Sequence, residues 1–152
     1  NMKTLKQLLT KLNACEEVVK WAEDKTIEEV VEQCHRGDWL LWLAQKVEIG
    51  LKPLTLARGH CANTVRHLMK DERSIKAVDT AIAFGEGKAT LGVLYDALYD
   101  AAYIAYASYA ADAVADAEKK ENQMLTADIC RKYIGDLIIN RVNELIEIVK
   151  NK

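Results

Sequence analysis

Residues 90–120 read TLGVLYDALYDAAYIAYASYAADAVADAEKK, and this stretch decides the fold class because helix-favouring residues run through it without a break. Gly92 is its only glycine, proline does not occur in it, and alanine recurs along most of its length. Alanine has the highest intrinsic helix propensity, whereas proline and glycine interrupt helices. The stretch therefore predicts one long alanine- and tyrosine-rich helix of about 30 residues, roughly 45 Å at the 1.5 Å rise of an α-helix.

The remainder of the chain carries the same helical signals, since it has few helix-breaking residues and its apolar residues recur three or four positions apart. Thr26 and Glu29 have the spacing of a capping box, and Asp71 or Ser74 is suited to begin a later helix. Further helices are expected over residues 4–23, 26–36, 38–47, 54–69, 71–84 and 126–149. The pattern predicts an all-α protein, a single domain over residues 1–152 that forms a compact bundle of about seven helices.

Composition and charge argue against two classes of binding partner, nucleic acids and membranes. The formal net charge is -2, without the clustered lysines and arginines that nucleic-acid binding requires. No window approaches the roughly 18 uninterrupted apolar residues of a membrane span, and the first residues lack the apolar segment of a signal peptide. We therefore expect a cytoplasmic protein with neither a membrane nor a nucleic-acid partner. In that reducing compartment the four cysteines are expected to be free thiols, namely Cys15, Cys34, Cys61 and Cys130.

No arrangement of residues in the sequence supports catalysis or metal binding. His60 and His67 share one predicted helix, but seven residues separate them by roughly 10 Å along its axis, too far for one zinc ion without further ligands. Adjacent residues such as Cys34 and His35 point in different directions on a helix, so they do not form a nucleophile and base pair. We expect no enzyme activity, no metal site and no cofactor.

The long predicted helix carries a candidate recognition face. Tyr95, Tyr99 and Tyr103 lie four residues apart and so project from one stripe, with Asp96 and Asp100 beside them. Residues 89–118 contain no lysine or arginine. An acidic and aromatic face of this kind suits a basic protein partner. The alternative is that the tyrosines pack against neighbouring helices and the carboxylates belong to an ordinary solvated face.

A second set of residues carries a family resemblance. The sequence CHRGDWLLWLA over residues 34–44 resembles the signature of a helical family of immunity proteins found in bacterial and prophage genomes. Further similarity lies in the Gly85-Glu86-Gly87 turn and in ADICR over residues 127–131, and the likeness covers about residues 13–140. The resemblance implies a protein that neutralises a toxin by binding it, and it defines no catalytic residues.

Three hypotheses for function follow. The leading one is an immunity-type or prophage accessory protein that sequesters a protein toxin. The second is a helical domain that binds a small ligand in a pocket around Arg58, His60 and Arg66. The third is a structural module that forms homodimers through the alanine-rich helix, since small residues permit close contact between helices.

Overall fold

The computed structural model describes residues 2–108 and 116–151, and the side chains of residues 4–101 and 118–151. These parts are helical without any strand, which confirms the predicted all-α fold class. The elements are α1 (Met2–Lys11), α2 (Glu16–Ala22), α3 (Ile27–Gln33), α4 (Gly37–Lys46), α5 (Leu51–Asn63), the short 3-10 helix η1 (Arg66–Leu68), α6 (Glu72–Gly85), α7 (Leu91–Ser108) and α8 (Asp116–Lys150). The described parts of the chain therefore contain eight α-helices, where about seven were expected.

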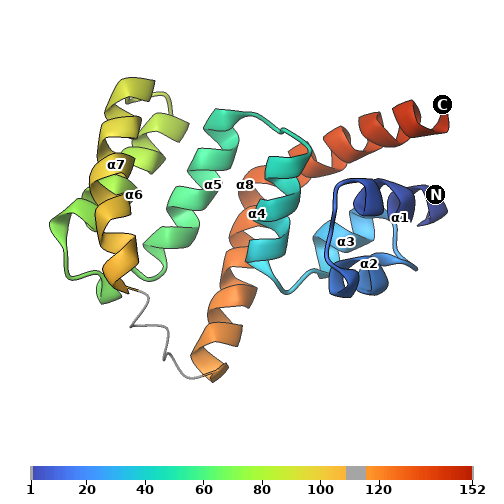
Figure 1. Cartoon of the computed structure of the whole chain (residues 1–152), viewed down its shortest axis with the longest axis horizontal. Coiled ribbons are helices and arrows are strands. Elements are labelled where there is room, and N and C mark those ends of the chain that lie inside the picture. The colour runs from blue at the N-terminus through green and yellow to red at the C-terminus, as the bar shows by residue number, and fades with distance from the viewer. Residues whose placement is uncertain (1, 109–115, 152) are drawn as a thin grey trace.

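Several of the predicted boundaries are wrong. The expected helix over residues 54–69 is α5, which ends at Asn63, followed by the separate 3-10 helix η1. The expected helix over residues 4–23 is two helices, because the chain turns between them at Asn13, whose φ of 62° lies in the left-handed region. The last helix begins at Asp116 rather than at Thr126, and at 35 residues it is longer than the alanine-rich α7. The prediction of one long helix over 90–120 is also wrong, because its two described parts belong to α7, which ends at Ser108, and to the start of α8 (Figure 1), while residues 109–115 lie outside the described part of the chain.

Local hydrogen bonds explain where the helices begin. Thr26 and Glu29 form the predicted capping box at the start of α3, with distances of 3.1 and 3.2 Å. The Asp71 side chain accepts a hydrogen bond from the backbone N–H of Arg73, 2.8 Å away, and so caps α6. Thr126 was expected to start a helix, but it lies inside α8. Its hydroxyl there donates to the backbone carbonyl oxygen of Asn122 at 2.8 Å.

The helices lie in a row, as Figure 1 shows. The α6–α7 hairpin forms one end, α5 comes next, α4 and α8 lie in the middle, and the short helices α1, α2 and α3 form the other end together with both chain termini. The α5–α6 and α6–α7 pairs have extensive contacts, and α8 packs on α1, α3, α4 and α5. Helix α8 is therefore the element that joins the N-terminal helices to the rest.

Most of the hydrophobic core surrounds α8. Ile134, Ile138 and Val142 on α8 are completely buried, in a cluster to which α1, α2, α3, α4 and α5 all contribute. A second, smaller cluster consists of Ala81, Phe84 and Leu94, between α6 and α7. Helix α7 is thus attached mainly through α6, away from the principal core.

Two arginines on α8 bind the carboxyl ends of neighbouring helices. Arg131 donates to the carbonyl oxygens of Val31 and Cys34 at 3.1 and 2.7 Å, and Arg141 donates to the carbonyl of Val47 at 2.8 Å. The last carbonyls of a helix lack partners within the helix, so a cation placed there satisfies them. These bonds hold α3 and α4 at defined positions along α8.

Gly37 allows α4 to approach α8 closely. A Cβ atom on Gly37 would lie 2.1 Å from the Thr126 Oγ1 atom and 2.6 Å from the Thr126 backbone carbon. Both distances are far below van der Waals contact, and the backbone atom cannot move aside without shifting α8. Only glycine fits at this position, which explains the break that the sequence places there.

The Gly37→Ala variant should lower the free energy of unfolding by about 3 kcal/mol, because the added methyl group forces α4 and α8 apart. Gly92→Ala is the matched control, since a Cβ there meets only the Thr90 hydroxyl at 4.0 Å. That control should raise the free energy of unfolding by up to about 0.5 kcal/mol through helix propensity. Urea denaturation followed by circular dichroism measures both values, and equal stability of the two variants would contradict the contact.

Candidate functional site

Helix α7 turns a row of large apolar side chains to solvent. Tyr95 and Tyr99 are 56% and 75% exposed, and Leu91 and Leu98 are also exposed at the edge of the buried stripe, beside Leu94, which is 1% exposed. The exposed residues follow steps of three and four, so they are neighbours on one side of the helix. We call this surface the α7 face and define it as Leu91, Tyr95, Asp96, Leu98, Tyr99 and Asp100.

The buried side of α7 shows that this exposure is not the usual amphipathic pattern. Leu94 and Ala97 are buried, and Leu94 packs with Ala81 and Phe84 of α6. An ordinary surface helix is polar on the side opposite its buried stripe. Helix α7 instead keeps Tyr95 and Tyr99 there, next to Asp96, with Leu91 and Leu98 exposed at the border of the buried stripe. Exposed tyrosine and leucine are typical of a surface that is covered in a complex.

The two aspartates of the α7 face are exposed, and no described residue forms an ion pair or hydrogen bond with either carboxylate. Arg73 at the start of α6 is near enough for the charge of Asp100 to act on it, but its guanidinium is bound to Asp71 at 3.0 and 3.2 Å. The pKa of Arg73 is raised first by that hydrogen bond and to a smaller extent by Asp100. Within the described part of the chain, no direct contact neutralises the Asp96 or Asp100 carboxylate.

Four of the five predicted face residues are thus placed together on α7. The alternative in which the tyrosines pack against neighbouring helices does not describe Tyr95 or Tyr99, which are both exposed. Tyr103 lies on the same helix, but its side chain is outside the described residues. Leu91 and Leu98 complete the face, and the apolar periodicity of the sequence was the signal that could have found them.

The alternative ligand residues do not converge on one site. The Arg58 guanidinium donates to Gln45 at 2.7 Å, and the His60 ring stacks on Tyr133 with 4.4 Å between the ring centroids. Arg66 forms two hydrogen bonds with Asp79, and these lower the pKa of the Asp79 carboxyl. Because each side chain has its own partner, these three residues form no common anion pocket among the described contacts.

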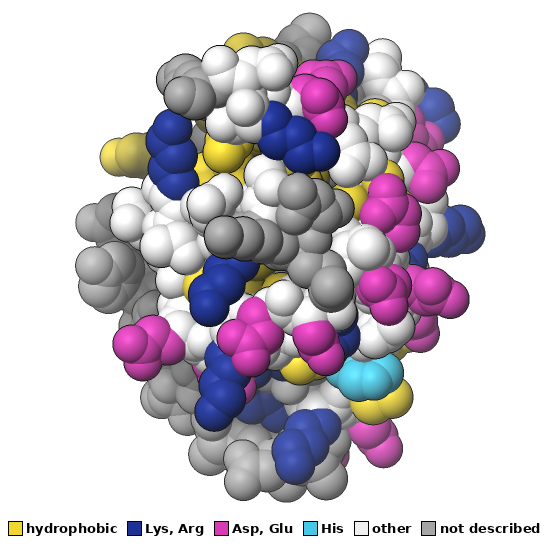
Figure 2. All heavy atoms as spheres, turned by 90° about the vertical axis from the view of Figure 1, so that its right-hand side faces the viewer, with side chains coloured by type: hydrophobic (Ala, Val, Ile, Leu, Met, Phe, Trp, Pro, Cys, Tyr) yellow, Lys and Arg dark blue, Asp and Glu magenta, His cyan; other side chains and the backbone are white. Residues whose placement is uncertain are grey.

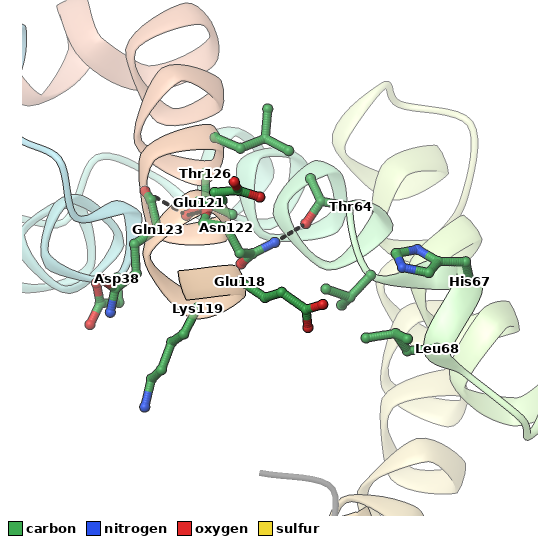
Figure 3. Close-up of a pocket in the computed structure, with 12 residues that line it drawn as sticks. Asp38, Thr64, His67, Leu68, Glu118, Lys119, Glu121, Asn122, Gln123 and Thr126 are labelled. Atoms are coloured by element: carbon green, nitrogen blue, oxygen red, sulfur yellow. Dashed lines mark hydrogen bonds between the residues drawn. The ribbon is translucent and has the colours of Figure 1, made fainter. Parts of the chain in front are cut away.

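A pocket of about 630 Å³ lies elsewhere, between the end of α5, η1 and the first turns of α8 (Figure 3). Its walls include Val65, Leu68 and Leu125, and its polar lining includes Glu118 and Asn122. Sequence reasoning missed this pocket because its two walls come from distant segments. The spacing of residues 118, 122 and 125, on one side of a helix, was a partial signal.

Three of the four cysteines are buried near the contact between α4 and α8. The Cys34 thiol donates to the Arg36 carbonyl at 3.4 Å, and the Cys61 and Cys130 thiols each lie 3.8 Å from a backbone carbonyl. Burial raises the pKa of Cys34, and the neighbouring Cys61 together with burial raises that of Cys130. A hydrogen bond with Cys130 lowers the pKa of Cys61. The three thiols are packed in the core, and the described residues contain no cluster of three metal-binding side chains.

Comparison with protein-family models, curated proteins and solved structures found no match for this chain. None of the described helices combines the length and the apolar composition that crossing a lipid bilayer would require. The resemblance of residues 34–44 to immunity proteins therefore rests on the sequence motifs alone, and function has to be argued from the surface.

Two leucines on α7 distinguish its buried side from its exposed face. Leu94→Ala should lower the free energy of unfolding by about 2–4 kcal/mol, because it removes a fully buried side chain from the small α6–α7 cluster. Leu98→Ala removes the same atoms from an exposed position and should change stability by less than about 0.5 kcal/mol. Thermal and urea denaturation of both variants measure this difference, and similar losses of stability would show that α7 is placed differently.

Proposed function

We propose that this protein binds and neutralises a basic protein partner, in the manner of an immunity protein that sequesters a toxin in the cytoplasm. The observation that carries the proposal is the α7 face, where exposed tyrosines and leucines lie beside two aspartates without partners among the described residues. Binding by surface complementarity requires no catalytic group, in keeping with the sequence motifs that resemble the immunity family.

The aromatic and aliphatic part of the face supplies affinity. Tyrosine is enriched among the residues that dominate binding energy, since it buries a large flat area and loses few rotatable bonds. Tyr95 and Tyr99 lie one helical turn apart, with Leu91 and Leu98 beside Tyr95. A partner that covered these side chains would remove from water the two largest side chains that residues 91–101 expose, Tyr95 and Tyr99.

Charge favours a basic partner over a second copy of the chain. Asp96 and Asp100 are acidic and the sequence of α7 contains no lysine or arginine, so two α7 helices placed together would bring like charges close. The opposite end of the molecule, seen in Figure 2, mixes lysine and arginine with aspartate and glutamate, and its hydrophobic side chains show only in small separate areas. That end offers no comparable apolar and acidic surface.

The double variant Asp96→Lys with Asp100→Lys should weaken the complex by about 2 kcal/mol or more, roughly thirtyfold in Kd, because it places like charges against a basic surface. The double variant Glu32→Lys with Asp136→Lys makes the same change in net charge on α3 and α8, and it is the matched control. Tagged wild-type and variant proteins are used to capture partners from a lysate of the source cells.

The expected result is a basic protein, retained in stoichiometric amount by the wild type and by the control, and lost by the α7 variant. Circular dichroism checks that all three proteins remain folded. Equal retention by the α7 variant and the control would rule out the α7 face as the binding surface.

A growth assay tests neutralisation separately from binding. The captured protein, expressed alone, should arrest growth of the host, and co-expression of this chain should restore growth, whereas the α7 variant should restore it poorly. A captured protein that does not affect growth would contradict the immunity assignment and leave only partner binding.

A further inference from the structure

The pocket between η1 and α8 combines two apolar walls with an acidic rim. Its volume of about 630 Å³ falls in the range of sites for small ligands. It is lined by Asp38, Thr64, Val65, His67, Leu68, Glu118, Lys119, Glu121, Asn122, Gln123, Leu125 and Thr126. None of these residues belongs to the α7 face, so the pocket is independent of the proposed partner surface.

Exposed leucines face this pocket from two separate elements. Leu68 on η1 is 56% exposed and Leu125 on α8 is 48% exposed, and both line the same hollow together with Val65. Leaving such side chains in water is unfavourable by comparison with covering them by apolar atoms. The walls therefore favour a ligand that has an apolar segment.

The carboxylates of the lining are of two kinds. Asp38 is neutralised by Arg36, whose two hydrogen bonds of 2.7 and 2.9 Å lower the pKa of the Asp38 carboxyl. Glu118 and Glu121 form no ion pair or hydrogen bond through their side chains with the rest of the described chain. Their negative charge is available to a ligand.

Figure 3 shows how the rim is arranged. The Glu118 side chain extends across the pocket towards Leu68, and His67 lies on that same opposite wall. Lys119 extends away from that wall, so its positive charge does not fill the space beside Glu118. The open part of the rim is consequently acidic.

The base of the pocket is held by a chain of hydrogen bonds. The Asn122 amide donates to the Thr64 hydroxyl at 2.8 Å, and that hydroxyl donates to the Cys61 carbonyl at 2.6 Å. These bonds connect α8 to the end of α5 and fix the distance between the two walls. A ligand would meet a largely preformed site.

We propose that this pocket binds a small organic amine, with a primary ammonium group on a short apolar chain. The ammonium group lies at the Glu118 carboxylate, Glu121 adds negative charge to the same lining (Figure 3), and the chain lies against Leu68 and Leu125. An ammonium donates three hydrogen bonds and carries the charge that the rim lacks. A ligand of the same chain length that ends in a carboxylate would be repelled by the glutamates. A ligand that ends in a hydroxyl would gain only the contact with the leucines.

The test uses three probes that share a six-carbon chain: n-hexylammonium, n-hexanoate and 1-hexanol. Each is titrated into the full-length, isotope-labelled protein and followed by the backbone amide resonances. Hexylammonium should give saturable shifts for residues 64–68 and 118–126, with an affinity roughly tenfold above that of hexanol. Hexanoate should give no saturable shift there.

Two pairs of variants keep the test specific. Glu118→Gln with Glu121→Gln should lower the hexylammonium affinity roughly tenfold, whereas Glu144→Gln with Glu147→Gln, at the same spacing further along α8, should leave it unchanged. Leu125→Ser should weaken binding, and Leu137→Ser, which is also an exposed leucine of α8, should not. Equal affinity for all three probes, shifts at other residues, or unchanged affinity after removal of both carboxylates would overturn the proposal.

A capped lysine, Nα-acetyl-lysine methylamide, distinguishes the source of the amine. If it binds as well as hexylammonium, the natural ligand is a lysine side chain of a peptide. If it binds roughly tenfold more weakly, the ligand is a free amine, because the peptide groups then clash with the rim. Both results support the ammonium site, which does not depend on the outcome of the α7 experiments.

Discussion

The close contact between Gly37 and Thr126 is the constraint on which the rest of the structure depends. Because Gly37 has no side chain, α4 lies directly against α8, and the buried face of α8 can then reach the N-terminal helices. Arg131 and Arg141 lie on the same helix and bind the ends of α3 and α4. Packing and hydrogen bonds therefore act together, and α8 holds the short helices that are too small to be stable alone.

The same construction explains why α7 is available for binding. Among the described side chains the main core contains none from α7, which is attached through α6 and a small cluster that includes Leu94. Its outer side is not needed for folding, yet it carries Tyr95 and Tyr99 where a solvated helix would have polar residues. The exposed tyrosines and the aspartates beside them are the basis of the proposal that a basic partner covers this face.

The sequence was sufficient for local features and insufficient for those that depend on distant contacts. The Thr26–Glu29 capping box was predicted correctly because its hydrogen bonds join residues three apart. The turn at Asn13 and the early start of α8 were missed, since the packing of α1 and α8 decides them. The periodicity of α7 placed Tyr95 beside Asp96, but only the position of α6 decides that this side faces solvent. The pocket was not predictable because its walls lie far apart in the chain.

The central claim is that the α7 face is the surface that a basic protein covers. Hydrogen–deuterium exchange of this protein, alone and in complex with the captured partner, tests it most directly. The account predicts slower exchange across residues 91–101 in the complex, with the amides of α1, α2 and α3 unchanged. Slower exchange confined to α1, α2 and α3, with α7 exchanging as in the free protein, would contradict it.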